Sequence, residues 1–75
     1  MKLSVLKPKE IIRILKKINF FIDHQKGSHI TMLNEKDNRR VVIPFHNKDL
    51  KKGTLKSIFK QAGLNTEEFN ELNKN

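Results

Sequence analysis

The side chains best suited to acid–base chemistry in this sequence are its three histidines, His24, His29 and His46. An imidazole can take up or release a proton near neutral pH, which makes it a common general acid or base. The chain has no cysteine, so thiolate chemistry is excluded, and no carboxylate lies at a defined metal-site spacing from the histidines. We therefore expect no metal and no cofactor. Proton transfer by a single imidazole is the chemistry that remains.

Of the three, His29 has the most suggestive surroundings, because it follows a Lys26-Gly27-Ser28 turn where a strand is predicted to start. The N–H groups of Gly27 and Ser28 and the charge of Lys26 can hold a phosphate. An imidazole beside a bound phosphate is what metal-free cleavage of a phosphodiester would use. Taken alone this signal is weak, and an ordinary surface histidine on a strand is the competing interpretation.

The direction of His29 depends on the register of the hairpin around Gly27. One register places apolar residues of the two strands opposite one another, Phe20 and Ile22 against Ile30 and Met32. It needs a three-residue loop with Gly27 in the left-handed conformation, and it turns His29 away from the apolar face. A two-residue Lys26-Gly27 turn would instead pair His24 with His29 and bury Thr31. We favour the first register because it keeps one face apolar.

The surrounding pattern predicts the element order α-β-β-β-α. A first helix is expected over 8–18, with Pro8 in its first turn and Asn19 ending it in a left-handed conformation. Three short segments with alternating or β-branched apolar residues then predict an antiparallel meander, in FFIDHQ, HITML and RRVVIPF. Both helices pack most simply on one face of this sheet, which defines an α+β fold.

The second helix is expected to begin at Thr54 as N-cap and to end at Gly63. Asn65 and Glu68 can form a capping box for a short last turn that holds Phe69. Residues from about 70 to 75 are expected to form a frayed tail.

Length and charge restrict the partners. The chain has 75 residues and a net charge of +8, which predicts one domain over 1–75 with an acidic partner such as nucleic acid or an acidic protein. A membrane surface is the weakest candidate, because no long basic amphipathic helix dominates. No signal peptide or membrane helix is expected, so the predicted location is cytoplasmic.

Four segments of the sequence form a recognisable set. They are the helix ending at Leu15 before Phe20, the KGSH of residues 26–29, the IPFH of residues 43–46 and the LKKGTLKSIFKQAGL of residues 50–64. In this order and at this spacing, over nearly the whole chain, they resemble the HicA family of toxins from type II toxin–antitoxin systems.

The resemblance implies a fold similar to the double-stranded-RNA-binding domain and a metal-independent endoribonuclease that cuts mRNA and arrests growth. It implies a HicB-like antitoxin that covers the active face, and it assigns the catalytic residue to His29. RNA or phosphate contacts are expected from the turn, the Pro-x-His motif and the start of the second helix, namely Lys26, Gly27, Ser28, His46, Lys52, Gly53 and Thr54.

Several alternatives stay open. His46 is equally suited to capping the loop before the second helix, and a structural histidine is the better interpretation of His24. Phe21 and Phe45 are expected at the surface, where either one could stack on a base or pack on a partner. A non-catalytic RNA-binding module with the same fold is the main functional alternative, and a pure protein-interaction module is a third.

Overall fold

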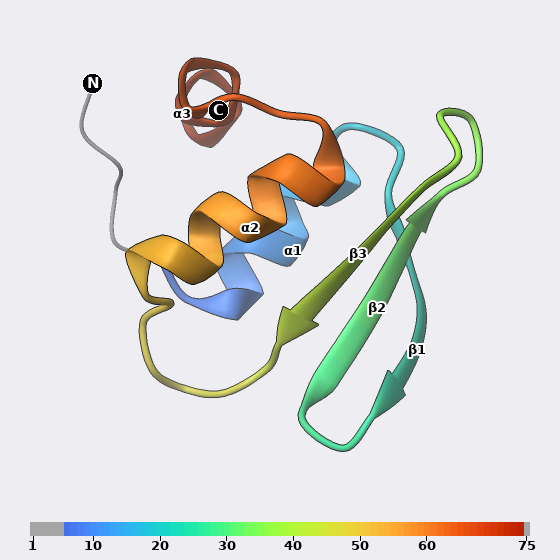
Figure 1. The fold of residues 1–75 in the computed structure, drawn as a ribbon, viewed down its shortest axis with the longest axis vertical. Helices are drawn as coiled ribbons and strands as arrows, with labels where there is room; N and C mark the ends of the chain where they lie inside the picture. Colours follow the sequence, from blue (N-terminus) through green and yellow to red (C-terminus); the bar gives the residue numbers. More distant parts are fainter. Residues whose placement is uncertain (1–5, 75) are drawn as a thin grey trace.

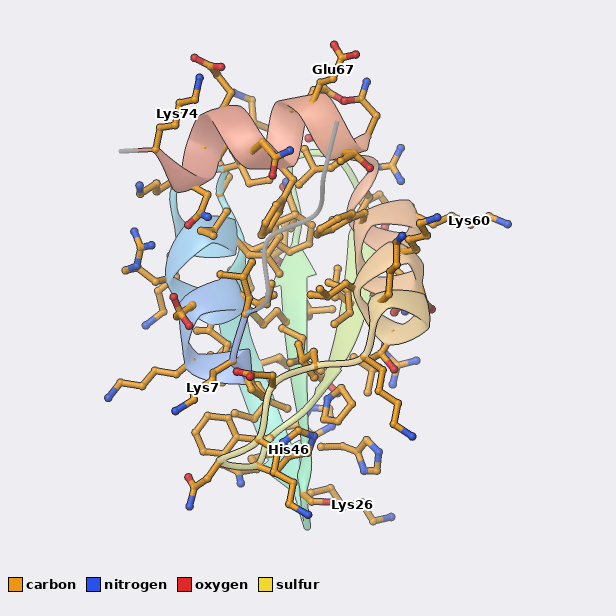
Figure 2. The ribbon with its side chains drawn as sticks, turned by 90° about the vertical axis from the view of Figure 1, so that its left-hand side faces the viewer. Lys7, Lys26, His46, Lys60, Glu67 and Lys74 are labelled. Atoms are coloured by element: carbon orange, nitrogen blue, oxygen red, sulfur yellow. The ribbon has the colours of Figure 1, made fainter. Side chains whose placement is uncertain are left out.

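The structure, a computed structural model, describes residues 6–74, so residues 1–5 and Asn75 of the predicted domain lie outside the described residues. The chain order is α1 (Pro8–Lys16), β1 (Phe21–Lys26), β2 (His29–Asn34), β3 (Arg39–Pro44), α2 (Lys52–Ala62) and α3 (Thr66–Asn73). The strands form an antiparallel sheet in the order β1-β2-β3, and α1 and α2 cover one of its faces (Figures 1 and 2). The predicted α-β-β-β-α fold, similar to the double-stranded-RNA-binding domain, is confirmed. A third helix is added at the C-terminal end.

Helix α1 forms because its apolar residues recur on one side. Ile11, Ile14 and Leu15 are buried against the sheet, while Pro8 occupies the first helical position. The expected end at residue 18 is two residues too late, since the helix ends at Lys16 and a turn follows. Asn19 takes the predicted left-handed conformation, with φ of 72°.

The register of the first hairpin differs from both predicted registers. The loop contains only Gly27 and Ser28, and it joins the facing pair Lys26 and His29. Gly27 has the predicted positive φ, 57°, and Ser28 does not, which is typical of a type II′ turn. A β-bulge then shifts the register between Ile22 and His24.

The bulge explains why neither predicted register is found. Beyond it Ile22 faces Met32, while nearer the turn Gln25 faces Ile30. One extra residue, Asp23, changes the parity, so a two-residue loop still keeps the apolar side chains on the helix side. Both predicted registers assumed a regular β1 strand, so they did not include the extra residue at the bulge.

The core lies between the sheet and the helices. Its most enclosed side chains come from both layers, among them Ile11, Ile14, Met32, Val41, Ile43 and Ile58. Helix α3 closes one end of this layer against α1 and α2 (Figure 2), where the rings of Phe59 and Phe69 lie with their centroids 4.2 Å apart.

Helix α3 is longer than the expected single turn. The predicted capping box is present, since the N–H of Glu68 donates to Asn65 Oδ1 at 2.8 Å and the N–H of Asn65 donates to Glu68 Oε1 at 3.0 Å. The helix then continues to Asn73, through most of the segment expected to be a frayed tail. Two tertiary contacts hold it there: Leu72 packs against the core, and Lys17 Nζ donates to the Leu72 carbonyl at 3.1 Å.

The start of α2 also differs from the prediction. Thr54 is not the N-cap, because Lys51 adopts the extended cap conformation and its carbonyl accepts the first helical hydrogen bond, from Leu55, at 2.9 Å. The helix therefore begins at Lys52 and includes Gly53 and Thr54 in its first turn. Gly63 ends it in the left-handed conformation, as predicted, with φ of 77°.

Candidate active site at one end of the sheet

His29 is the first residue of β2 and projects from the sheet face that no helix covers. It lies opposite Lys26 on β1 and opposite Pro44 on β3. The next residue, Ile30, is buried under the helices, so strand alternation turns His29 to the open face as predicted. The His29 side chain is exposed, and within residues 6–74 it makes no hydrogen bond. Its imidazole is therefore available to a ligand.

The turn before His29 is tied to the end of β3. The N–H of Phe45 donates to the Ser28 carbonyl at 2.6 Å, which extends the pairing of His29 with Pro44 by one more hydrogen bond. The Pro-x-His segment is consequently held against the KGSH turn, and Figure 2 shows Lys26 and His46 at the same end of the molecule. Two motifs that are well separated in sequence thus meet at one end of the sheet.

His46 takes part in the structure of the loop that leads to α2. Its Nδ1 accepts a hydrogen bond from the N–H of Lys48 at 3.2 Å, so a neutral ring carries its proton on Nε2. The predicted capping of this loop is therefore observed. The ring is exposed, and its Nε2 remains available to a phosphate or another acceptor.

The first turn of α2 carries the other predicted RNA-binding residues. Within the described residues, the N–H groups of Lys52, Gly53 and Thr54 have no acceptor, because the N-cap Lys51 supplies no side-chain oxygen. Uncapped N–H groups at a helix N-terminus favour an anion. In residues 6–74, however, no hydrogen bond joins this turn to the KGSH turn, and Figure 1 shows the loop after β3 running away from the sheet before α2 begins. The two groups are separate phosphate-binding candidates.

His24 lies on the same open face and has a partner. It pairs with Thr31 across the sheet, and its Nδ1 lies 2.7 Å from a carboxylate oxygen of Asp23. That carboxylate occupies the β-bulge, which accounts for its position beside the ring. Among residues 6–74 there is no group of three or more His, Asp or Glu side chains placed to hold a metal ion.

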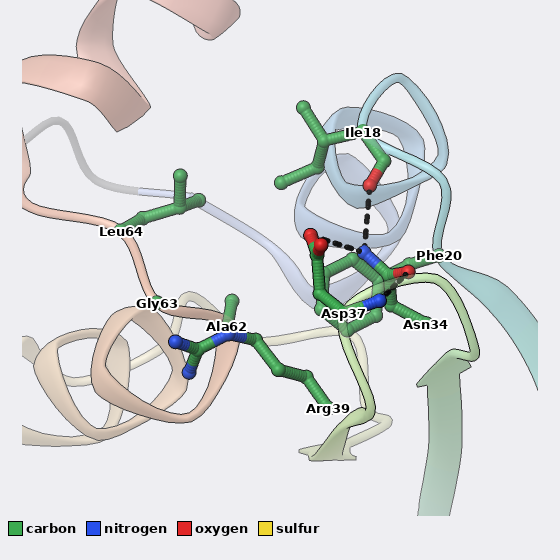
Figure 3. A pocket seen from close by; sticks show the side chains of 8 residues that line it. All are labelled: Ile18, Phe20, Asn34, Asp37, Arg39, Ala62, Gly63 and Leu64. Atoms are coloured by element: carbon green, nitrogen blue, oxygen red, sulfur yellow. Dashed lines mark hydrogen bonds between the residues drawn. The ribbon is translucent and has the colours of Figure 1, made fainter.

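The opposite end of the sheet contains a polar residue that sequence reasoning missed. Asn34, the last residue of β2, is only 2% exposed. Its Nδ2 donates to the Ile18 carbonyl at 3.2 Å and to Asp37 Oδ2 at 3.3 Å, and its Oδ1 accepts from the N–H of Asp37 at 3.1 Å (Figure 3). The Asn and Asp three residues apart in NEKD indicated a turn, but nothing local indicated the bond to Ile18.

A second feature that was missed is a groove between α1 and β1, lined by three basic side chains of α1 together with apolar side chains. Lys9, Arg13 and Lys16 lie on the exposed side of α1. The predicted register placed Ile22 on the helix side of the sheet but did not bring it together with these three side chains in one groove.

The element order α-β-β-β-α, with both main helices on one face of an antiparallel sheet, places the chain in the fold class of double-stranded-RNA-binding domains. A family model described as the HicA toxin of bacterial toxin–antitoxin systems matches residues 8–64, and the chain belongs to this family. It is therefore a toxin of a toxin–antitoxin system, and the family implies an antitoxin partner. No curated protein matches the chain. Over residues 6–74, none of the helices has the length and apolar character needed to span a membrane.

Proposed function

We propose that the chain is an endoribonuclease that cuts mRNA and thereby inhibits translation and growth until a HicB-like antitoxin neutralises it. The observation that carries the proposal is the state of His29, which is exposed, unbonded within residues 6–74 and adjacent to a positively charged turn. An exposed imidazole without a partner in the fold is free to exchange a proton with a bound substrate, which supports the proposal.

Cleavage of RNA without a metal can use the RNA's own 2′-hydroxyl. That oxygen attacks the adjacent phosphorus, its proton leaves to a base, and the bond to the 5′-oxygen breaks as that oxygen gains a proton from an acid. The imidazole of His29 is suited to either transfer. The charge of Lys26 and the N–H groups of the turn favour a phosphate beside it.

Other basic groups would hold the rest of the RNA strand. His46 is tied to the KGSH turn through its neighbour Phe45, so its free Nε2 is suited to a phosphate close to His29. The N–H groups of Lys52, Gly53 and Thr54 would bind a phosphate further along the strand, because they belong to a separate part of the surface.

The test is incubation of the purified protein with an RNA transcript in the presence of a chelator, comparing wild type with His29→Ala. We expect the cleavage rate to fall by a factor of about 10² to 10⁴, the usual effect of one general acid or base. His24→Ala is the matched control, because His24 is an exposed histidine on the same sheet face. It should retain most of the activity.

Equal cleavage by wild type and His29→Ala would refute the catalytic assignment. Binding of RNA without cleavage by the wild type would instead identify a non-catalytic RNA-binding module. Synthetic DNA of the same sequence, which lacks the 2′-hydroxyl, should remain intact if the proposed chemistry holds.

A further inference from the structure

The groove between α1 and β1 lies on the helix-covered side of the sheet, so it is separate from the open face that carries His29. Its volume is about 460 Å³. Ile12 of α1 and Ile30 of β2 line it from within the core, being only 7% and 4% exposed. Ile22 and Phe45 line it nearer the surface and are 42% and 39% exposed. Exposed large apolar side chains around a recess are typical of an interaction site.

The rim of the groove on the α1 side is strongly basic. Lys9, Arg13 and Lys16 all contribute to its lining. Within residues 6–74 none of the three makes an ion pair with a carboxylate. The groove therefore combines an apolar interior with three uncompensated positive charges.

We propose that this groove is a docking site for an acidic segment of the antitoxin, whose apolar side chains fill the groove and whose carboxylates meet the basic rim. The inference rests on the toxin–antitoxin assignment and is independent of the catalytic chemistry proposed for His29. Charge complementarity identifies the occupant, because a second copy of a chain with net charge +8 would bring positive charge against positive charge.

RNA would complement only the charged residues of the groove and not its apolar residues. Phosphates would be attracted to Lys9, Arg13 and Lys16, but they would leave Ile22 and the buried isoleucines behind it without an apolar partner. An acidic protein segment could place its apolar side chains against the isoleucines of the interior and its carboxylates against the basic side chains of the rim.

The manner of docking follows from the shape of β1. This strand pairs only with β2, so its other edge is free within the described sheet. The bulge between Ile22 and His24 interrupts the regular spacing of its N–H and carbonyl groups, which disfavours addition of a partner strand there. We therefore expect recognition through side chains that enter the groove.

The experiment measures the dissociation constant of the full chain for its purified antitoxin by titration calorimetry. Ile22→Asp should weaken binding about tenfold or more, as expected for an apolar anchor at an interface. Ile22→Val is its matched control, because it keeps an apolar side chain at the same exposed position of the groove. It should bind within about threefold of wild type, since the apolar contact is retained.

A second pair tests the charged rim without altering the strand. Arg13→Glu, on the exposed side of α1, should weaken binding most at low salt, while Lys60→Glu, on the exposed side of α2 and outside the groove, should have little effect. Thermal unfolding of each variant checks that the fold is intact.

Unchanged antitoxin binding by both Ile22→Asp and Arg13→Glu would overturn the inference. So would equal losses for Ile22→Asp and Ile22→Val, because binding would then not depend on the apolar character of the groove. A loss of RNA binding in Ile22→Asp with intact antitoxin binding would assign the groove to RNA. RNA cleavage by Ile22→Asp should equal that of wild type, so failure of this inference is distinguishable from failure of the proposed catalysis.

Discussion

The two ends of strand β2 carry polar residues in opposite circumstances. Asn34 at one end is almost fully buried and every polar group of its side chain is hydrogen-bonded, to Ile18 in the turn that follows α1 and to Asp37 in the turn that follows β2. His29 at the other end is exposed, faces the open side of the sheet and makes no hydrogen bond within residues 6–74. The two residues lie only five positions apart on one central strand.

This contrast separates a residue that stabilises the fold from one that is free for the chemistry we propose. The amide of Asn34 joins three segments of the chain, so its loss would leave buried polar groups without partners. The imidazole of His29 has no partner within residues 6–74, so the fold does not depend on it and it is free for the chemistry that we propose. The strand between them fixes both positions, because Ile30 and Met32 anchor it in the core.

Replacing each polar residue by alanine should produce opposite results, and these are the largest effects we expect. His29→Ala should reduce RNA cleavage by about 10² to 10⁴ while changing the free energy of unfolding by no more than about 0.5 kcal/mol. Asn34→Ala should lower the free energy of unfolding by about 1 to 3 kcal/mol, since the Ile18 carbonyl and Asp37 lose their partner. Urea denaturation and a cleavage assay on the folded fraction measure the two quantities.

If Asn34→Ala reduced cleavage per folded molecule as much as His29→Ala does, the two ends of β2 would be coupled. Asn34 could then not be assigned to stability alone. A marked loss of stability in His29→Ala would equally contradict the separation of the two roles. Asp37→Ala provides a graded comparison, because it removes the carboxylate partner of Asn34 and leaves the bond from Asn34 to Ile18 in place.

Sequence patterns predicted most of the fold because its local signals agree. The apolar stripe of α1, the left-handed Asn19 and Gly63 and the capping box of Asn65 with Glu68 are each determined within a few residues. The orientation of His29 was also predicted, although the predicted hairpin registers were wrong. The predicted orientation was correct because burial of Ile30 and Met32 on the helix side places His29 on the opposite face, whatever loop precedes the strand.

The features that sequence reasoning missed all depend on distant contacts. The bulge at Asp23 is defined by the pairing of β1 with β2. The length of α3 depends on its contacts with Lys17 and the core, and Asn34 donates to a carbonyl 16 residues earlier. For the candidate site, the pattern predicted its residues but not their grouping. Only the structure shows that the first turn of α2 is separate from the KGSH turn.

The two hairpin turns offer an intermediate test, because each contains a residue with positive φ. Gly27 has φ of 57° in the turn before His29, and Asn38 has φ of 53° in the turn after Asn34. Gly27→Ala should destabilise the fold by about 1 to 2 kcal/mol through backbone strain alone, since an added Cβ would meet nothing within 4 Å. Gly27→Asn should cost less, because asparagine tolerates this conformation, as Asn38 does.

Gly53→Ala is the control for this series. Gly53 lies in the first turn of α2 without a positive φ, and an added Cβ there also meets nothing within 4 Å. Stability should stay unchanged or rise by about 0.5 to 1 kcal/mol, since alanine favours a helix over glycine. Denaturation curves that ranked Gly53→Ala below Gly27→Ala would show that the turn is not strained as described.

The smallest expected effect concerns a lysine at each end of the sheet. Lys26 lies beside His29, and Lys36 lies in the turn after Asn34; both are exposed. If only the His29 end binds RNA, Lys26→Ala should reduce the slope of log binding constant against log salt concentration by about one, the loss of one phosphate contact. Lys36→Ala removes the same charge and should leave the slope unchanged. Equal slopes for the two variants would mean that RNA binding depends on the total charge of +8 and not on the position of the lysine. The difference between the two ends of the sheet would then apply to His29 and Asn34 but not to the charged surface around them.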